Sequence, residues 1–148
     1  MPDRKNLTLR IVPCLLLGAC ALALPWRAAA IDPALQKAVD RGSELFHHET
    51  FNGSGRVCNT CHLEGGTRAG LLPNGEAIPS LRNAATIFPR VRERDHALIT
   101  LPDQIRGCVA GGLQGKPPEY GSEALNALAS YVTSLSQGQP IDMGGAAR

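Results

Sequence analysis

The chain has 148 residues, which is enough for one domain and too few for two of ordinary size. Aromatic residues make up only 4% of the sequence, so a core must be filled mainly by aliphatic side chains or by a bound group. The formal net charge of +2 depends on residues 1–30, which hold four of the 15 basic residues and one of the 13 acidic residues. The remaining chain has a net charge of −1, which argues against nucleic-acid binding.

Residues 1–30 have the pattern of a secretory signal peptide. The segment begins with basic residues, continues with an apolar run over residues 11–24, and ends in Ala28-Ala29-Ala30, which suits a cleavage site. The apolar run is shorter than the roughly 20 residues of a membrane span. We expect residues 1–30 to be cleaved and the protein to be exported to the bacterial periplasm. The alternatives are an uncleaved anchor and a lipoprotein site at Cys20, which would tether the protein to the membrane.

The first predicted helix lies within residues 31–50. Asp32 is a favourable N-cap, and Pro33 suits the first helical position. Apolar or small side chains then recur at spacings of three and four, which predicts one buried helical face. These residues are Leu35, Ala38, Val39, Gly42, Leu45 and Phe46.

Residues 58–62 read CNTCH, with two cysteines two residues apart and a histidine directly after the second. A thioredoxin-like redox site would need alternating strands and helices, and a zinc site would need four spaced ligands. The sequence offers neither pattern. C-x-x-C-H is the attachment signature of c-type haem. We therefore predict that Cys58 and Cys61 bind one haem c per chain covalently, and that His62 ligates its iron.

Two further helices are predicted in the C-terminal half. A short helix runs from Pro102 to about Val109, and a longer one lies within residues 121–138, where Ser122 can cap it. The longer helix has an apolar stripe formed by Leu125, Leu128, Ala129, Val132 and Leu135.

Loops rich in glycine and proline separate these helices, at residues 52–56, 65–80 and 111–121. No segment alternates convincingly as a strand. Long loops are unusual in a small domain, but they have a purpose if they wrap a large flat apolar group. We therefore expect residues 31–148 to form one all-α domain of three to five helices, with long loops around one haem.

Three features resemble a class I c-type cytochrome: Gly42-x-x-x-Phe46 on the first helix, the CNTCH motif, and Tyr131 on the last helix. The resemblance covers most of residues 33–138. It implies a small cytochrome c-like domain in which the first and last helices cross, with the glycine allowing their close approach. The segment HHETFNGSGRV between Phe46 and the first cysteine is longer than the family usually has.

The sixth iron ligand is less obvious. Class I cytochromes usually supply a methionine before the last helix, and this chain has none there. Three candidates remain, Cys108, Met143 and His96. Cys108 is favoured, because it is the single thiol outside the motif after removal of the leader and lies on a predicted helix. The alternative roles of Cys108 are a small buried side chain and an intermolecular disulfide. His96 lies among charged residues, which is typical of a solvated loop.

Residues 100–142, beginning TLPDQIRGCVAGGLQGKP, are similar to the haem domain of thiosulfate dehydrogenases and to the cysteine-ligated subunit of the periplasmic sulfur-oxidising system. In that family the cysteine ligates iron and nearby arginines hold the anionic substrate. The resemblance implies that Cys108 ligates the haem iron. If the protein is an enzyme, it also implies catalytic roles for Cys108, Arg94 and Arg106. The match is partial, since Gln104 stands where the family has an arginine.

Two functions stand as hypotheses. The favoured one is a monohaem electron carrier that exchanges electrons with redox partner proteins. The other is a haem enzyme, or an enzyme subunit, that oxidises thiosulfate or a related small sulfur anion. The arginine-rich segment FPRVRERDH at residues 88–96 fits both hypotheses, because it can pair with haem propionates, dock a partner, gather an oxyanion or simply be solvated. The family arginine and serine positions that are lost here, at Gln104 and at Gly111-Gly112, favour the carrier.

Overall fold

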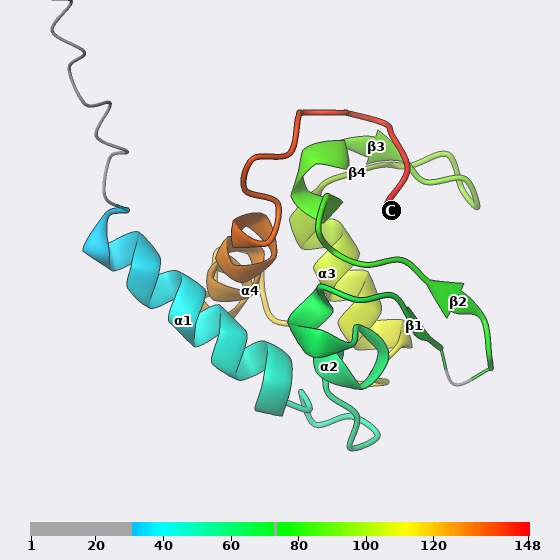
Figure 1. Ribbon diagram of the computed structural model, residues 1–148. Helices are drawn as coiled ribbons and strands as arrows, with labels where there is room; N and C mark the ends of the chain where they lie inside the picture. Colours follow the sequence, from blue (N-terminus) through cyan, green and yellow to red (C-terminus); the bar gives the residue numbers. More distant parts are fainter. Residues whose placement is uncertain (1–30, 73) are drawn as a thin grey trace, which may run out of the picture. The chain divides into compact units, whose positions relative to one another are not determined.

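The structure, a computed structural model, describes residues 31–72 and 74–148 (Figure 1). The predicted signal peptide and Cys20 lie outside the described residues. The helices are α1 (Pro33–His48), α2 (Cys58–Cys61), α3 (Leu101–Gly111) and α4 (Glu123–Ser134), with single 3-10 turns at η1 (Glu64–Gly66) and η2 (Ala84–Ile87). The expected helical fold with long loops is therefore confirmed. None of the helices in the described part of the chain is long and apolar enough to cross a membrane.

Helix α1 begins as its sequence predicts. The Asp32 carboxylate accepts a hydrogen bond from the Ala34 amide at 2.7 Å, and Pro33 occupies the first turn. The predicted buried face is only half correct, because Leu35 is 48% exposed while Leu45 and Phe46 are buried. The reason is that α4 packs against α1 around Gly42 and beyond it, so that no other described element covers the first turns.

Helices α1 and α4 cross at Gly42, and α4 packs on its other side against α3 (Figure 1). A β-carbon at position 42 would lie 2.7 Å from the Tyr131 β-carbon and closer still to the Ala127 carbonyl group. The two backbones therefore meet where only glycine fits. The crossing expected from the class I pattern is confirmed, and it buries one face of α4, formed by Leu125, Ala127, Leu128, Tyr131 and Val132.

Two short antiparallel ladders interrupt the loops, although the sequence predicted no strand. Strand β1 (Gly70–Leu71) pairs with β2 (Ala77–Ile78), and β3 (Arg90–Val91) pairs with β4 (Leu98–Ile99). Each strand has two residues, which is too short for an alternating pattern to show in the sequence. The second ladder sets Arg90 opposite Ile99 and so fixes the backbone of the arginine-rich segment beside the start of α3.

Helix α3 starts at a capping box, one residue before its predicted start. The Thr100 hydroxyl accepts from the Asp103 amide, and the Asp103 carboxylate accepts from the Thr100 amide at 2.8 Å. Tyr120 adds a hydroxyl donor to the same carboxylate. These hydrogen bonds lower the pKa of Asp103 to about 2, with Tyr120 as the largest cause.

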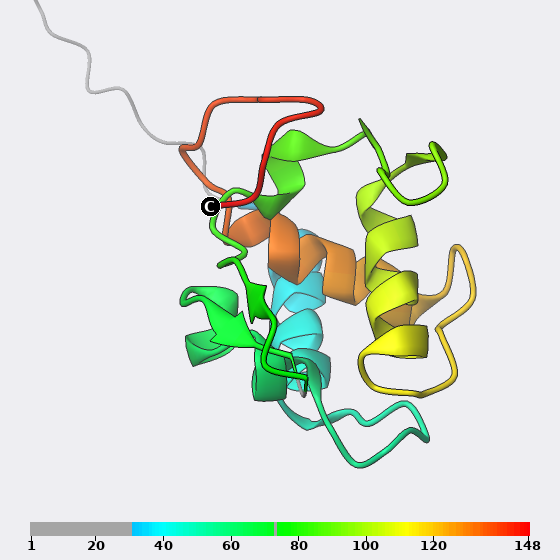
Figure 2. The same cartoon turned by 90° about the vertical axis from the view of Figure 1, so that its right-hand side faces the viewer.

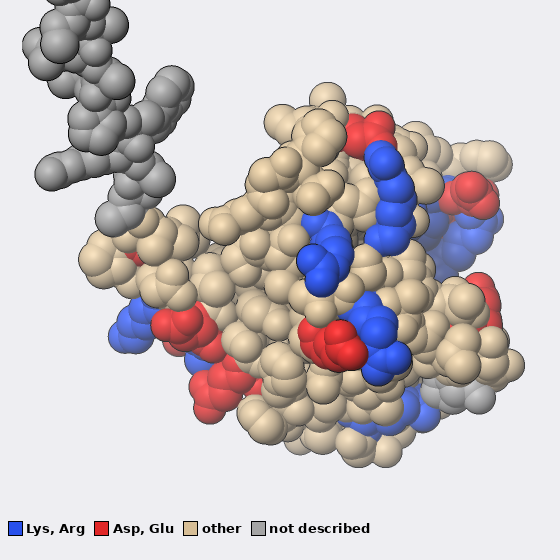
Figure 3. Space-filling model, in the orientation of Figure 1, with Lys and Arg blue, Asp and Glu red and all other residues tan. Residues whose placement is uncertain are grey.

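The C-terminal tail, residues 141–148, folds back over η2 (Figure 2). The Asp142 amide donates to the Thr86 carbonyl and the Gly144 amide donates to the Ile87 carbonyl, both at 2.9 Å. These bonds bring the end of the tail to the rim of the cavity described below. The face of the domain shown in Figure 3 carries scattered side chains of both charges and large neutral areas, without a continuous basic patch.

Candidate haem-binding site

A cavity of about 590 Å³ opens between α2, α3 and α4. Its volume lies within the range of small-molecule and cofactor pockets, roughly 300–1,000 Å³. Most of its lining is apolar and comes from Phe46, Leu72, Ile78, Leu81, Leu101, Ile105, Leu113, Leu128 and Val132. Polar and titratable side chains converge on it from two opposite sides, so the cavity combines an apolar interior with a small number of reactive groups.

One side of the cavity, which we call the α2 wall, consists of Cys58, Cys61 and His62. Helix α2 spans the four residues from the first cysteine to the second, and the His62 amide donates to the Cys58 carbonyl at 3.0 Å. Because residues three apart share one helical face, both thiols point to the same side. Burial raises the pKa of the Cys58 thiol to about 12, and Cys61 is also buried.

The two residues between the cysteines hold this turn in place. The Thr60 hydroxyl accepts from the Val57 amide at 3.1 Å, and the Asn59 side chain accepts from the Gly65 amide at 2.8 Å. Tyr131 on α4 donates to the Gly65 carbonyl, also at 2.8 Å. The α2 wall is therefore attached to the crossing of α1 and α4.

His62 has the burial and the protonation state that suit a metal ligand. Its Nδ1 atom is buried and has no hydrogen-bond partner among the described residues. Burial lowers the pKa of the imidazole, while the nearby Pro79 carbonyl opposes this to a lesser extent without forming a hydrogen bond of normal geometry. The ring is thus kept neutral, which is the form that binds metals. A metal-bound histidine uses one ring nitrogen and turns the other toward an acceptor, and the Pro79 carbonyl is the nearby acceptor here.

The opposite side, which we call the α3 wall, contains Cys108, Gln104 and Arg90. Cys108 is an exposed residue that lines the cavity, and the protein atoms around its thiol raise its pKa by desolvation. Cys108 lies near enough to the α2 wall that charge on Cys61 would raise its pKa further. Of the three candidates for the sixth ligand, only Cys108 lines the cavity. Met143 is 67% exposed on the tail, and His96 is exposed on the loop between β3 and β4.

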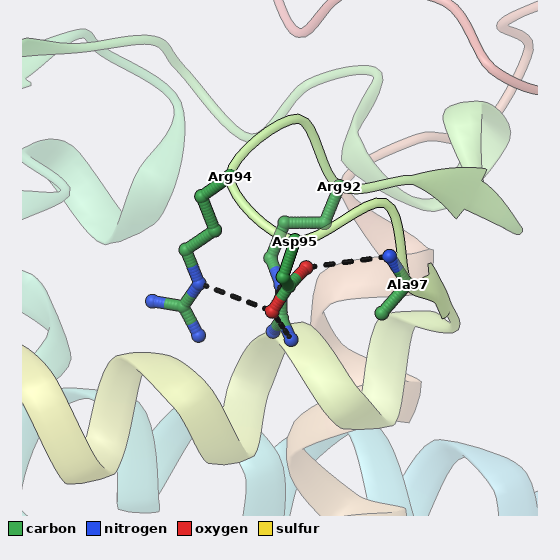
Figure 4. Close-up of polar contacts among 4 residues, drawn as sticks. All are labelled: Arg92, Arg94, Asp95 and Ala97. Atoms are coloured by element: carbon green, nitrogen blue, oxygen red, sulfur yellow. Dashed lines mark hydrogen bonds and ion pairs between the residues drawn. The ribbon is translucent and has the colours of Figure 1, made fainter.

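Three arginines of the segment 88–96 also line the cavity. Arg92 and Arg94 both reach the Asp95 carboxylate, at 2.6 Å and 3.5 Å (Figure 4). Arg92 is the main cause of the low pKa of Asp95, about 2. Arg90 differs, because no carboxylate pairs with it in the described part of the chain and its Nε atom is buried without a partner. The rim therefore carries an excess of positive charge.

Arg106 takes no part in this site. Its guanidinium group donates to the Pro118 carbonyl and stacks over the Tyr120 ring, 4.2 Å from the centroid. It is not among the residues that line the cavity, whereas Arg94 is. The residue that sequence reasoning missed is Arg90. Its only signal was membership of an arginine-rich segment, which does not reveal which side chains turn inward.

The two walls are tied together outside the cavity. The Ser54 amide and the Arg56 guanidinium donate to the Leu113 and Gly112 carbonyls, both at 2.9 Å. The segment that leads into α2 is thus bonded to the end of α3. The residues present fit a haem, because an apolar cavity separates two thiols and a neutral imidazole from a third thiol. The porphyrin would supply four further ligands, and no cluster of three or more His, Cys, Asp or Glu exists among the described residues to hold a metal without it.

Residues 41–141 match the family described as the SoxA/TsdA cytochrome c domain. The chain belongs to this family. SoxA/TsdA cytochrome c domains bind covalently attached haem c, so the cofactor predicted from the sequence is confirmed, as is the class I c-type cytochrome fold. The match includes the CNTCH motif, the arginine-rich segment, α3 and α4.

Individual relatives agree with the SoxA/TsdA assignment. The thiosulfate dehydrogenase of Stutzerimonas stutzeri is 32% identical over 72% of this chain and 34% of its own length. The thiosulfate dehydrogenase of Psychrobacter arcticus is 29% identical over 84% of this chain and 37% of its own length. The structure of thiosulfate dehydrogenase TsdBA from Marichromatium purpuratum superposes with a TM-score of 0.62 at 26% identity, over 81% of this chain and 28% of that one. This chain thus spans about a third of the length of these relatives.

Proposed function

We propose that this SoxA/TsdA-type domain is an exported electron-transfer protein in which Cys58 and Cys61 hold the haem through thioether bonds. His62 and Cys108 would ligate its iron. The observation that carries the proposal is that one apolar cavity is lined both by the CNTCH turn of α2 and by Cys108 of α3. Haem c, when bound, supplies one-electron exchange, and the chain supplies anchoring, ligation and the surrounding field.

The residues of the two walls have separate tasks. The α2 turn positions both thiols on one side, and burial keeps His62 neutral and able to donate a nitrogen lone pair. Cys108 supplies a thiolate from the other side. A thiolate stabilises ferric iron more than a methionine thioether does, so the reduction potential lies below that of a methionine-ligated cytochrome. Arg92 and Arg94 lie at the rim, where they would stabilise negative charge such as that of the haem propionates.

Export and partners follow from the same proposal. A haem joined to cysteines in the bacterial periplasm requires a secreted chain, and residues 1–30 have the pattern of a signal peptide. The physiological partners are redox proteins that give and accept one electron. The match to the SoxA/TsdA family supports partners within sulfur-compound oxidation.

A second candidate function is oxidation of thiosulfate or a related sulfur anion, either alone or as a subunit. The observation in its favour is Arg90, which lines the cavity beside Cys108 and pairs with no carboxylate among residues 31–72 and 74–148. Two observations favour the carrier instead. Gln104 occupies the position of a family arginine, and Arg106 faces Tyr120 rather than the cavity.

The deciding experiment is electron paramagnetic resonance of the purified ferric holoprotein, comparing wild type with Cys108→Ala. We expect a low-spin signal typical of His/thiolate ligation that disappears in the variant. Met143→Leu and His96→Ala serve as matched controls and should leave the signal unchanged. A wild-type signal that survives in Cys108→Ala would contradict the proposed ligation. Thiosulfate-dependent reduction of an external acceptor by the wild type, at a catalytic rate, would favour the enzyme over the carrier.

A further inference from the structure

We propose that Gln104 is a positioning residue that raises the reduction potential of the haem by donating a hydrogen bond to the Cys108 sulfur, and that Arg90 orients its amide. This inference rests on the proposed ligation of iron by Cys108. It concerns a position where the family has an arginine and this chain has a glutamine, and it gives that glutamine a role of its own.

The contact is formed within one helix. Gln104 precedes Cys108 by four residues on α3, so the two side chains lie on the same face. The Gln104 Nε2 atom lies 3.4 Å from the Cys108 Sγ atom, which is within hydrogen-bonding range for a sulfur acceptor. This bond favours the thiolate and lowers the pKa of Cys108, against the larger effect of burial. Both residues line the cavity, so the bond lies at the site itself.

A second contact decides which way the amide points. The Arg90 Nη2 atom donates to the Gln104 Oε1 atom at 3.5 Å. If the amide were turned over, its NH2 group would face the guanidinium donors and its oxygen would face the sulfur. Both contacts would then be repulsive. Since Arg has only donors, it forces Gln104 to accept from Arg90 and therefore to donate toward Cys108.

Arg90 is well suited to this task because it is held from several sides. Its backbone is paired with Ile99 in the ladder of β3 and β4, and its guanidinium lies over the Phe88 ring, 5.4 Å from the centroid. Unlike Arg92 and Arg94, it has no carboxylate partner in the described residues that could draw it away from Gln104. The three residues thus form a chain of contacts, from guanidinium to amide to sulfur.

The direction of the effect follows from the electron density on the sulfur. A hydrogen bond to a metal-bound thiolate withdraws density that the sulfur would otherwise donate to iron, and outer contacts of this kind tune cofactor potentials. Ferric iron depends more on that donation than ferrous iron does. The Gln104 bond therefore favours the ferrous state, and it offsets part of the lowering that thiolate ligation causes.

The test is a potentiometric titration of the holoprotein, comparing wild type with Gln104→Leu. Gln104→Leu removes the donor while keeping a similar volume. We expect its equilibrium constant for reduction to fall about tenfold, which corresponds to about 59 mV for one electron. Gln104→Arg restores an N–H donor and should return the potential to the wild-type value or above. Gln36→Leu, an exposed glutamine on α1 that bonds Asp40, is the matched control and should leave the potential unchanged.

A comparison of two arginines tests the orienting role. Arg90→Met and Arg94→Met each remove one positive charge from the rim, but only Arg90 contacts Gln104. We expect Arg90→Met to lower the potential more than Arg94→Met does. We then make each arginine variant separately in the Gln104→Leu background. There the two should lower the potential equally, because the amide that Arg90 orients is gone. Equal effects of the two arginine variants in both backgrounds would overturn the orienting role.

Paramagnetic resonance of the same samples separates this inference from the function on which it rests. If the His/thiolate signal is present and Gln104→Leu has the potential of Gln36→Leu, the hydrogen-bond proposal is wrong and the ligation stands. If the wild type lacks a thiolate signal, both the ligation and the role of Gln104 are wrong. A lowered potential with the thiolate signal retained supports both.

Discussion

The α2 wall takes two thiols and an imidazole from five consecutive residues, whereas the α3 wall assembles Arg90, Gln104 and Cys108 from a strand and a helix. The first wall depends on one helical turn and can be recognised wherever that turn occurs. The second exists only when the ladder of β3 and β4 lies beside α3. In our proposal the local wall anchors the haem and the assembled wall sets its potential. Different residues thus attach the haem and adjust its reduction potential.

The largest expected effect concerns attachment. Replacing Cys58 and Cys61 together by alanine should abolish covalently bound haem, because no thiol of the α2 wall remains to form a thioether bond. Haem staining after denaturing electrophoresis, together with the intact mass, measures this loss. Cys108→Ala is the control and should keep its covalent haem. Loss of covalent haem in Cys108→Ala would break the distinction between an anchoring wall and a tuning wall.

A smaller effect is expected where the α2 wall meets the helix crossing. Gly42→Ala should lower the free energy of unfolding by about 2 kcal/mol, because the added methyl group overlaps Ala127 and Tyr131 and overpacking typically costs about 1–3 kcal/mol. Urea unfolding of the holoprotein measures the change. Gly111→Ala is a matched control at a helical glycine with open space around it, and it should be neutral or slightly stabilising. Equal stability of the two variants would show that the crossing is not as tight as the structure has it.

The smallest expected effect concerns the start of α3. Since folding lowers the pKa of Asp103 from 3.8 to about 2, its ionised form stabilises the folded state above pH 4, and this contribution is lost as the pH falls toward 2. Asp103→Asn should cost about 0.5–1 kcal/mol at pH 7, a small value because the carboxylate is exposed. Urea midpoints at pH 7, 4 and 2 should converge for wild type and variant at the lowest pH. A constant difference across this range would rule out the ionic contribution.

The difference between a wall built from consecutive residues and one built from separate elements also explains which features the sequence could predict. The cap of α1 at Asp32, the crossing at Gly42 and the CNTCH turn depend on neighbours in sequence or on a recognised family pattern, and each was predictable. The inward turn of Arg90 was not predictable, because it depends on a two-residue ladder that leaves no periodic signal. Arg106 lies on α3 near Cys108 in sequence, yet its side chain turns toward Tyr120. The count of thiols therefore identified Cys108, and its spacing from Gln104 is helical, but no signal in the sequence placed Arg90 beside them.

The crossing of α1 and α4 also bears on the order in which the chain folds and acquires its haem. It joins the first helix to the last, so the fold cannot close until nearly the whole polypeptide is available, and contacts of such long range form late. Until then Cys58 lacks the burial that raises its pKa to about 12 in the folded domain. Its thiol is then more readily ionised to the thiolate, which is the form that reacts as a nucleophile. The interval between emergence of the CNTCH segment and arrival of α4 is thus a window for maturation, and a variant that closes the fold early would shorten it.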